Sequence, residues 1–319
     1  MRPFFENNVL QQQPFKPMII VVDTTKAGSA SNTFVLPIIK DTTETVKIYW
    51  GDGTNSTGVT GNNTHVYAVG GIYTIEIESR LFGGIYFNNL GDKAKITKIA
   101  NYGQGVSRLN IGSFSGCSSL LSIDIGNIVS NGADATNQYR GCTALTTVPL
   151  LNLSSVTNAF AMFAYCAALT TVPLLNLSSV TNASSMFTDC TSLTTIPLLD
   201  LSSVTNATNM FRNCTSLTTV PLLNLSNCTT ATNMFRNCTS LTTIPLLDLS
   251  SVTDATNMFT GVTLTTQSYS DFLINLATLP LQSGVSFHGG NSKYNPTAAI
   301  ARAYLISNFG WTITDGGAA

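Results

Sequence analysis

Residues 209–245 read NMFRNCTSLTTVPLLNLSNCTTATNMFRNCTSLTTIP, so a segment of 24 residues is followed by a near copy of itself. Met-Phe pairs keep the same step from Met162–Phe163 to Met258–Phe259. A fixed period of this size predicts a solenoid, in which each repeat forms one coil that buries its apolar side by stacking on its neighbours. Fainter copies begin near Ile96, so we expect about seven coils over residues 93–263.

The apolar residues of one coil predict how the chain runs within it. In the coil that begins at Leu169 they follow the spacing L-x-x-L-x-L. We expect a short strand over residues 169–172, parallel to its neighbours at about 4.8 Å, and a helical or 3₁₀ turn over residues 184–190. Pro173 follows the strand and recurs in every regular coil. Because proline lacks an amide donor, the strand is expected to end there.

The repeat resembles a known family. Residues 202–225, SSVTNATNMFRNCTSLTTVPLLNL, are similar to the repeats of BspA-like leucine-rich-repeat surface proteins. The likeness covers about half of the chain, and it implies a leucine-rich-repeat solenoid in a protein of the adhesin or surface class. Family repeats often carry Asp, Ser and Trp where this chain has Pro-Leu-Leu. A ligand surface at that position is therefore expected to be specific to this chain.

The segment before the repeats is rich in alternating apolar residues and glycine turns. Trp50–Thr54 reads WGDGT, and His65-Val66-Tyr67 follows it in the order typical of a polycystic-kidney-disease (PKD) domain. This resemblance implies a small Ig-like β-sandwich within residues 1–92. We expect Asp52 to accept backbone amides two residues on in its turn. Whether Asp52 also binds Ca²⁺ is left open, because no second carboxylate lies nearby in the sequence.

The last segment, residues 264–319, has helical spacing over 269–279 and 296–309, with Asn295 as N-cap and Pro296 at the first helical position. Its final part resembles a terminal module of predicted phage tail or fibre-like proteins, through Ser292-Lys293-Tyr294, Ala301-Arg302 and residues 310–317. We expect a small helical cap with Trp311 packed beneath it. The predicted fold class is thus mixed β and α/β: an Ig-like (PKD-like) sandwich, a leucine-rich-repeat solenoid and a helical cap.

Composition limits the class of function. Only 10% of the residues are charged, and 15 Lys and Arg nearly balance 16 Asp and Glu. No basic field is present to bind nucleic acid or an anionic membrane. The apolar run from Met18 to Val22 is too short for a signal peptide, and no run is long enough to span a membrane. An uncharged polar surface favours an extracellular particle, and release by cell lysis is one route to it.

Chemistry-bearing residues are few. His65 and His288 lack the spacing of a metal pair. We interpret His65 as a turn or surface residue and His288 as an exposed loop residue. Carboxylates at Asp200 and Asp248 alternate with asparagines at the equivalent positions of other coils, so a charge is not required there. The same interpretation applies to Asp254 and Asp271. No catalytic, cofactor-binding or metal-binding residue is predicted.

Cysteines recur every 24 residues, at Cys142, Cys166, Cys190, Cys214 and Cys238. This series allows a disulfide ladder, a metal array or buried free thiols. Cys228 stands in the place of Val204, and Val262 stands in the place of Cys238. Exchange with valine in both directions is typical of a small buried hydrophobe, so we predict free, buried thiols. The Met-Phe pairs are likewise predicted to belong to the core.

Threonine pairs recur beside the prolines, as at Thr170-Thr171, and raise the alternative of ice binding. In a strand, adjacent residues point to opposite faces. Only one threonine of each pair is then expected to face outward, so the stacked coils would present one row of threonines. Ice binding would need two such rows.

The same period-two rule predicts an outward apolar stripe. If Val148 and Leu150 point inward, Pro149 and Leu151 point outward, and the stacked coils align them. The predicted interaction stripe consists of Pro149, Leu151, Pro173, Leu175, Pro197, Leu199, Pro221, Leu223, Pro245 and Leu247. The alternative is that the bend at each proline turns these leucines inward as a second core layer.

Together these patterns favour a non-enzymatic structural or adhesion protein of a bacteriophage virion: a tail, fibre or decoration component. Expected partners are other virion subunits or copies of the same chain, with a host receptor or glycan as a further partner. The alternative is a bacterial cell-surface adhesin of the BspA-like type. A remote alternative, a carbohydrate-active hydrolase, would need two carboxylates about 5 to 10 Å apart in one pocket.

Overall fold

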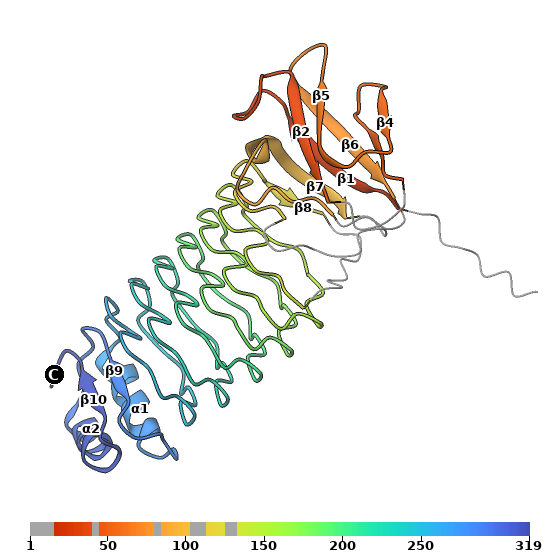
Figure 1. Cartoon of the computed structure of the whole chain (residues 1–319). Helices are drawn as coiled ribbons and strands as arrows, with labels where there is room; N and C mark the ends of the chain where they lie inside the picture. The colour runs from red at the N-terminus through yellow and green to blue at the C-terminus, as the bar shows by residue number, and fades with distance from the viewer. Residues whose placement is uncertain (1–15, 40–44, 80–83, 103–112, 125–132) are drawn as a thin grey trace, which may run out of the picture.

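The computed structural model describes residues 16–39, 45–79, 84–102, 113–124 and 133–319. Strands gather at one end, a long stack of coils follows, and two helices lie at the far end (Figure 1). The protein is mostly β with few helices, in agreement with the expected mixed β and α class.

Two sheets form the N-terminal part. The larger has the order β4-β3-β6-β1-β7-β8, and β2 pairs with β5 in a separate antiparallel ladder. The strands are β1 Met18–Asp23, β2 Thr33–Ile38, β3 Lys47–Tyr49, β4 Asn55–Thr57, β5 Gly61–Val66 and β6 Ile72–Glu78. Alternate residues of β1 and β2 are buried, so each strand turns one face to the core.

Strand β7 (Ile96–Tyr102) joins the sheet to the coils. It pairs antiparallel with β1 and parallel with β8 (Ser122–Ile123), which belongs to the next coil. Just before it, the short 3₁₀ helix η1 (Lys93–Lys95) ends in a buried lysine. Lys95 Nζ donates to the carbonyl of Ala30 in the β1–β2 loop (2.9 Å) and to that of Thr33 at the start of β2 (2.6 Å). The predicted domain boundary at 92/93 stays a prediction.

Each regular coil is hydrogen-bonded to both neighbours. On one side, the amides of Ala183 and Phe187 donate to the carbonyls of Asn206 and Met210, 23 residues ahead. On the other side, the amide of Thr194 donates to the carbonyl of Thr170, 24 residues back. The pattern repeats along the chain, and the coils lie in parallel (Figure 1). Every regular coil is therefore bonded to its neighbours, and the stack holds it in place.

The predicted helical turn over residues 184–190 is wrong. Its amides close successive β-turns, with Met186 bonded to Ala183 and Cys190 to Phe187. Ser185 and Asp189 have φ of 58° and 60°, and such left-handed residues interrupt any helix. The signal lay in other copies, where Asn209 and Asn213 or a glycine occupy these positions.

The predicted strand over residues 169–172 is reduced to an isolated bridge. Thr147 pairs with Thr171, and Thr195 with Thr219, without a continuous ladder. Two residues after each bridge comes a proline, which supplies no donor to continue it.

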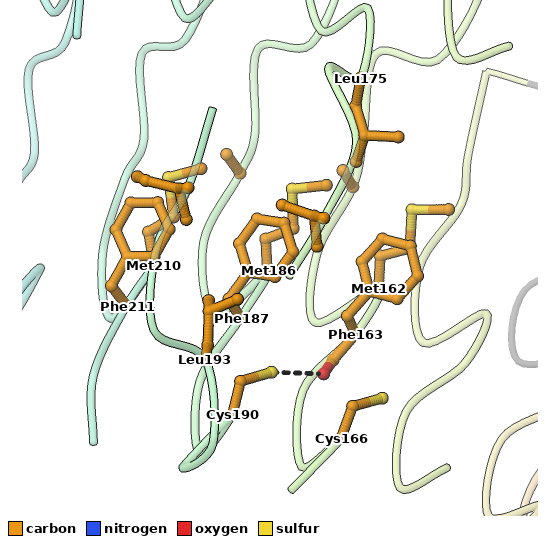
Figure 2. Close-up of a cluster of buried hydrophobic side chains, with 14 of the residues drawn as sticks. Met162, Phe163, Cys166, Leu175, Met186, Phe187, Cys190, Leu193, Met210 and Phe211 are labelled. Carbon is orange, nitrogen blue, oxygen red and sulfur yellow. Dashed lines mark hydrogen bonds between the residues drawn. The ribbon is translucent and has the colours of Figure 1, made fainter. Parts of the chain in front are cut away.

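A row of stacked rings runs through the core of the coils. Neighbouring ring centroids lie 5.5–6.1 Å apart, and the planes differ by 3–8°. The row consists of Phe114, Tyr139, Phe163, Phe187, Phe211, Phe235 and Phe259. Figure 2 shows the methionines and cysteines that flank it. The prediction that the Met-Phe pairs are core is confirmed, since every one is buried.

All seven cysteines are free and buried, which confirms the prediction from the Cys-Val exchange. The Cys190 thiol donates to the carbonyl of Phe163 in the preceding coil, at 3.2 Å (Figure 2). Burial raises the pKa of the Cys166 thiol to about 12. The thiols therefore act as small hydrophobic groups with one weak donor each.

The C-terminal part closes the stack. It contains α1 (Thr266–Leu276), β9 (Ser286–His288), α2 (Pro296–Phe309) and β10 (Thr312–Thr314). The amides of the last coil, at Ala255 and Phe259, donate to β9 carbonyls as earlier coils donate to the next coil. Trp311 is 2% exposed and its ring lies 6.1 Å from that of Phe287.

The helix ends largely follow the sequence signals. Asn295 Oδ1 accepts the amide of Ala298, and Pro296 occupies the first turn, as predicted. Helix α1 begins three residues before the predicted range 269–279, because Thr265 caps it by accepting the amide of Ser268. It also ends three residues before that range, at Leu276.

Candidate interaction surface

Around each proline bend, every third residue is buried. Leu169, Val172 and Leu175 are buried, and the residues between them are exposed or half-buried. A spacing of three is typical of polyproline-like chain, whereas a strand buries every second residue. Two neighbouring residues can therefore both face solvent here.

This spacing corrects the predicted stripe. Leu151, Leu175, Leu199, Leu223 and Leu247 are buried, at 0–3% exposure. The exposed leucines are Leu150, Leu174, Leu198, Leu222 and Leu246, at 49–64%. The prediction that Leu151 and its equivalents face solvent is wrong, and the alternative of a second core layer is right. The prolines keep their place on the face.

We call the exposed set the Pro-Leu row. Each of its five prolines is half-buried and precedes an exposed leucine. The row consists of Pro149-Leu150, Pro173-Leu174, Pro197-Leu198, Pro221-Leu222 and Pro245-Leu246.

The threonine pairs flank the row on one side. Both members of each pair are exposed, so the expectation of one outward row is wrong for the same reason. The hydroxyl of the first threonine in each pair bonds to the preceding coil. Thr194 Oγ1 donates to the carbonyl of Thr170 at 3.3 Å, and Thr218 Oγ1 donates to that of Thr194 at 3.2 Å.

Asparagine and aspartate flank the row on the other side. Asn176 Oδ1 accepts the amide of Ser178 at 3.2 Å, and Asp200 Oδ1 accepts that of Ser202 at 3.0 Å. The same bond recurs from Asn152, Asn224 and Asp248. An amide oxygen and a carboxylate oxygen perform the same task, which explains why the two residue types alternate. Hydrogen bonding from Ser202 lowers the pKa of Asp200.

A groove of about 560 Å³ lies along the C-terminal half of the row. It is lined by Leu198, Leu199, Asp200, Leu222, Leu223, Asn224, Leu246 and Asp248. A second hollow of about 700 Å³ shares Leu246 and reaches α1 at Ile274 and Asn275. The apolar surface therefore continues from the coils to the first helix.

A ladder of asparagines joins neighbouring coils. Asn182 Oδ1 accepts the amide of Ser184 at 3.0 Å, and Asn182 Nδ2 donates to Asn158 Oδ1 at 3.0 Å. Asn182 thus caps a turn amide of its own coil and also joins that coil to the preceding one. A second ladder was not predicted: Asn237 Nδ2 donates to Asn213 Oδ1 at 2.9 Å, and Asn213 Nδ2 donates to Asp189 Oδ1 at 2.8 Å. Its only signal in the sequence is an Asn or Asp directly before Cys190, Cys214 and Cys238.

The N-terminal turn uses both oxygens of Asp52. Oδ1 accepts the amide of Thr54 at 3.0 Å, as predicted, and Oδ2 lies 2.8 Å from His65 Nε2. Burial alone raises the pKa of Asp52, but the hydrogen bonds from Thr54 and His65 outweigh it and lower the pKa to about 2. His65 also stacks on Trp50 at 4.7 Å. Protein groups already occupy the oxygens that a Ca²⁺ ion would need.

The remaining sequence candidates are dispersed. The expectation that His288 lies in an exposed loop is wrong: it is half-buried in β9, and its Nδ1 accepts the amide of Gly290 at 3.0 Å. Asp254 Oδ1 accepts the amide of Thr256, and Asp271 Oδ1 accepts the side-chain amide of Gln267. Among the described residues no group of three or more His, Cys, Asp or Glu could hold a metal ion. No helix in the described part of the chain is long and apolar enough to cross a membrane.

Comparison with known proteins gives limited matches. Residues 133–243 and 157–272 match the family described as "Mycoplasma protein of unknown function, DUF285". No curated protein matches the chain. Among solved structures, a leucine-rich repeat protein from Bacteroides ovatus ATCC 8483 is 12% identical, with a TM-score of 0.18. The match covers 72% of this chain and 95% of that one.

Proposed function

We propose that this chain is a non-enzymatic structural or adhesion protein of a bacteriophage virion, where its coils present a repeated surface for protein or host-surface binding. The Pro-Leu row carries the proposal. Five identical exposed leucines stand in line on a face that is otherwise uncharged apart from Asp200 and Asp248. Exposed apolar strips of this kind mark interaction sites in soluble proteins.

We further propose a role for each part of the chain. The coils would be a leucine-rich-repeat solenoid of the BspA-like type, which attaches the display surface to an Ig-like, PKD-like module. The stacked ring row and the free cysteines support a purely architectural role for the repeats. The C-terminal part would act as cap or contact, as in phage tail or fibre-like proteins. Its partners would be other virion subunits, copies of itself or a host receptor or glycan, without nucleic acid or membrane insertion.

The groove contains two carboxylates, Asp200 and Asp248, which bears on the remote hydrolase alternative. They lie two coils apart, or about 10 Å at the usual spacing of stacked strands. A glycosidase acid needs a raised pKa, whereas hydrogen bonding lowers that of Asp200. Both side chains also make the turn bond that asparagine makes in other coils. These contacts favour a structural role for the pair.

Localisation tests the proposal. Antibodies against the purified protein should label virions prepared from cultures that carry the gene, as seen by immunogold electron microscopy. Labelling of the bacterial envelope would support the surface-adhesin alternative instead. Protein confined to the bacterial interior, with neither structure labelled, would overturn both.

A further inference from the structure

We infer that the Pro-Leu row binds a second copy of this chain, with the two stacks side by side and parallel about a two-fold axis. The inference rests on the proposed function, because it names the partner of the surface described there. It depends on the size of the row, on its spacing and on the charges beside it.

The row is large enough for such a contact. Five leucines that are 49–64% exposed, with five half-buried prolines, form a strip of the few hundred Å² that marks an interaction site. Two copies bury two strips together with the polar rows beside them. That sum approaches the total of about 1,000 Å² that a specific interface needs.

The spacing of the row favours a copy over a foreign partner. The leucines are 24 residues apart, and the coils hold them at a single repeat distance over roughly 20 Å. A partner must offer apolar groups at the same interval to contact all five. A second copy meets that condition because its own leucines have the same spacing, and two-fold symmetric interfaces are self-complementary.

The charges beside the row decide the orientation. Going across the face, the order is threonine pair, Pro-Leu row, then Asn or Asp. A two-fold axis parallel to the stack sets the Asp flank of each copy against the threonine flank of the other. An antiparallel arrangement with all five coils overlapping sets Asp200 against its own counterpart. Like charges at an interface are unfavourable, so the parallel arrangement is preferred.

Sedimentation velocity of the full chain tests the contact. The protein should sediment as a dimer at micromolar concentration. The triple variant Leu174→Ser, Leu198→Ser and Leu222→Ser should be a folded monomer with a Kd raised at least about 100-fold. The matched control Val69→Ser, Ile72→Ser and Ile300→Ser removes apolar side chains of 69–75% exposure elsewhere and should stay dimeric. Circular dichroism checks that each variant is folded.

Cysteine cross-linking tests the orientation, since every native cysteine is buried and an added surface thiol is the reactive one. In the parallel dimer, Leu150→Cys and Leu246→Cys should each form a disulfide with its own counterpart. In an antiparallel dimer neither would do so alone, and only a mixture of the two would cross-link, because disulfides need Cα atoms within about 7 Å. Leu198→Cys, at the centre, should cross-link in either case.

The outcomes separate the inference from the proposed function. A wild-type chain that stays monomeric overturns the second copy as occupant. If the triple serine variant is then also lost from virions in immunogold labelling, the row binds another subunit and the proposed function stands. Cross-linking only in the mixture overturns the parallel arrangement.

Discussion

The regular coils and the coil that precedes them place different side chains at one core position. The regular coils have Met162, Met186, Met210, Met234 and Met258 there, all buried. The preceding coil has Gln138, which is also fully buried, and neither polar atom of its side chain has a hydrogen-bond partner in the described part of the chain. The regular coils thus gain packing by placing each side chain beside its own copy. The coil that contains Gln138 departs from that rule and is less stable at this position.

The largest effect should follow from breaking the ring row inside the regular coils. Phe187→Ala leaves a cavity between two stacked rings and should lower the free energy of unfolding by about 3–5 kcal/mol. Guanidinium denaturation followed by circular dichroism measures the loss. Phe160→Ala serves as control, because Phe160 is 39% exposed and should cost little. Equal costs for the two variants would show that the row does not hold the stack.

Exchange of the two core residues tests the comparison in both directions. Met186→Gln should lower the free energy of unfolding by about 2 kcal/mol, because it buries an amide without partners. Gln138→Met should raise it by about 1 kcal/mol, because it removes such an amide and extends the methionine series. Both are measured by the same denaturation. A loss of stability in Gln138→Met would reveal that the amide has a function at the junction.

A smaller effect is expected at the asparagine ladder. Asn182→Ala removes one acceptor for a turn amide and one rung to Asn158, at a cost of about 1 kcal/mol. Thr195→Ala, on the exposed face of the next coil, is the control. A neutral Asn182→Ala in urea denaturation would indicate that water replaces both bonds.

The smallest effect concerns acid stability of the N-terminal turn. The pKa of Asp52 falls from 3.8 to about 2 in the folded protein. Its contribution is therefore complete above about pH 4 and is lost as the pH falls toward 2. Asp52→Asn should lower the urea midpoint near pH 7 and flatten its dependence on pH between 4 and 2, so that the variant and the wild type converge at acid pH. An unchanged slope between pH 4 and pH 2 would contradict this role for Asp52.

The sequence predicted the stacking and its contents better than the path of each coil. The exchange of Cys228 with valine identified buried thiols, and Asn295-Pro296 located the start of α2, because both signals are local. The exposure of Leu150 could not be predicted by counting in twos, since the proline bend changes the period from two to three. The left-handed turns at Ser185 and Asp189 could not be predicted from these two residues alone. The signal for them is the asparagine that other coils carry at the same positions. What the surface binds depends on a partner outside the chain.

Adjacent leucines test the central claim most directly, namely that one repeat builds a core layer and an exposed row from neighbouring residues. Leu198 is 61% exposed and Leu199 is 1% exposed. Unfolding by guanidinium should show Leu198→Ser as stable as the wild type within about 0.5 kcal/mol. Leu199→Ser should lose about 3 kcal/mol, because it leaves a cavity and buries a hydroxyl. Equal losses, or a larger loss for Leu198→Ser, would contradict the assignment of the row to the surface.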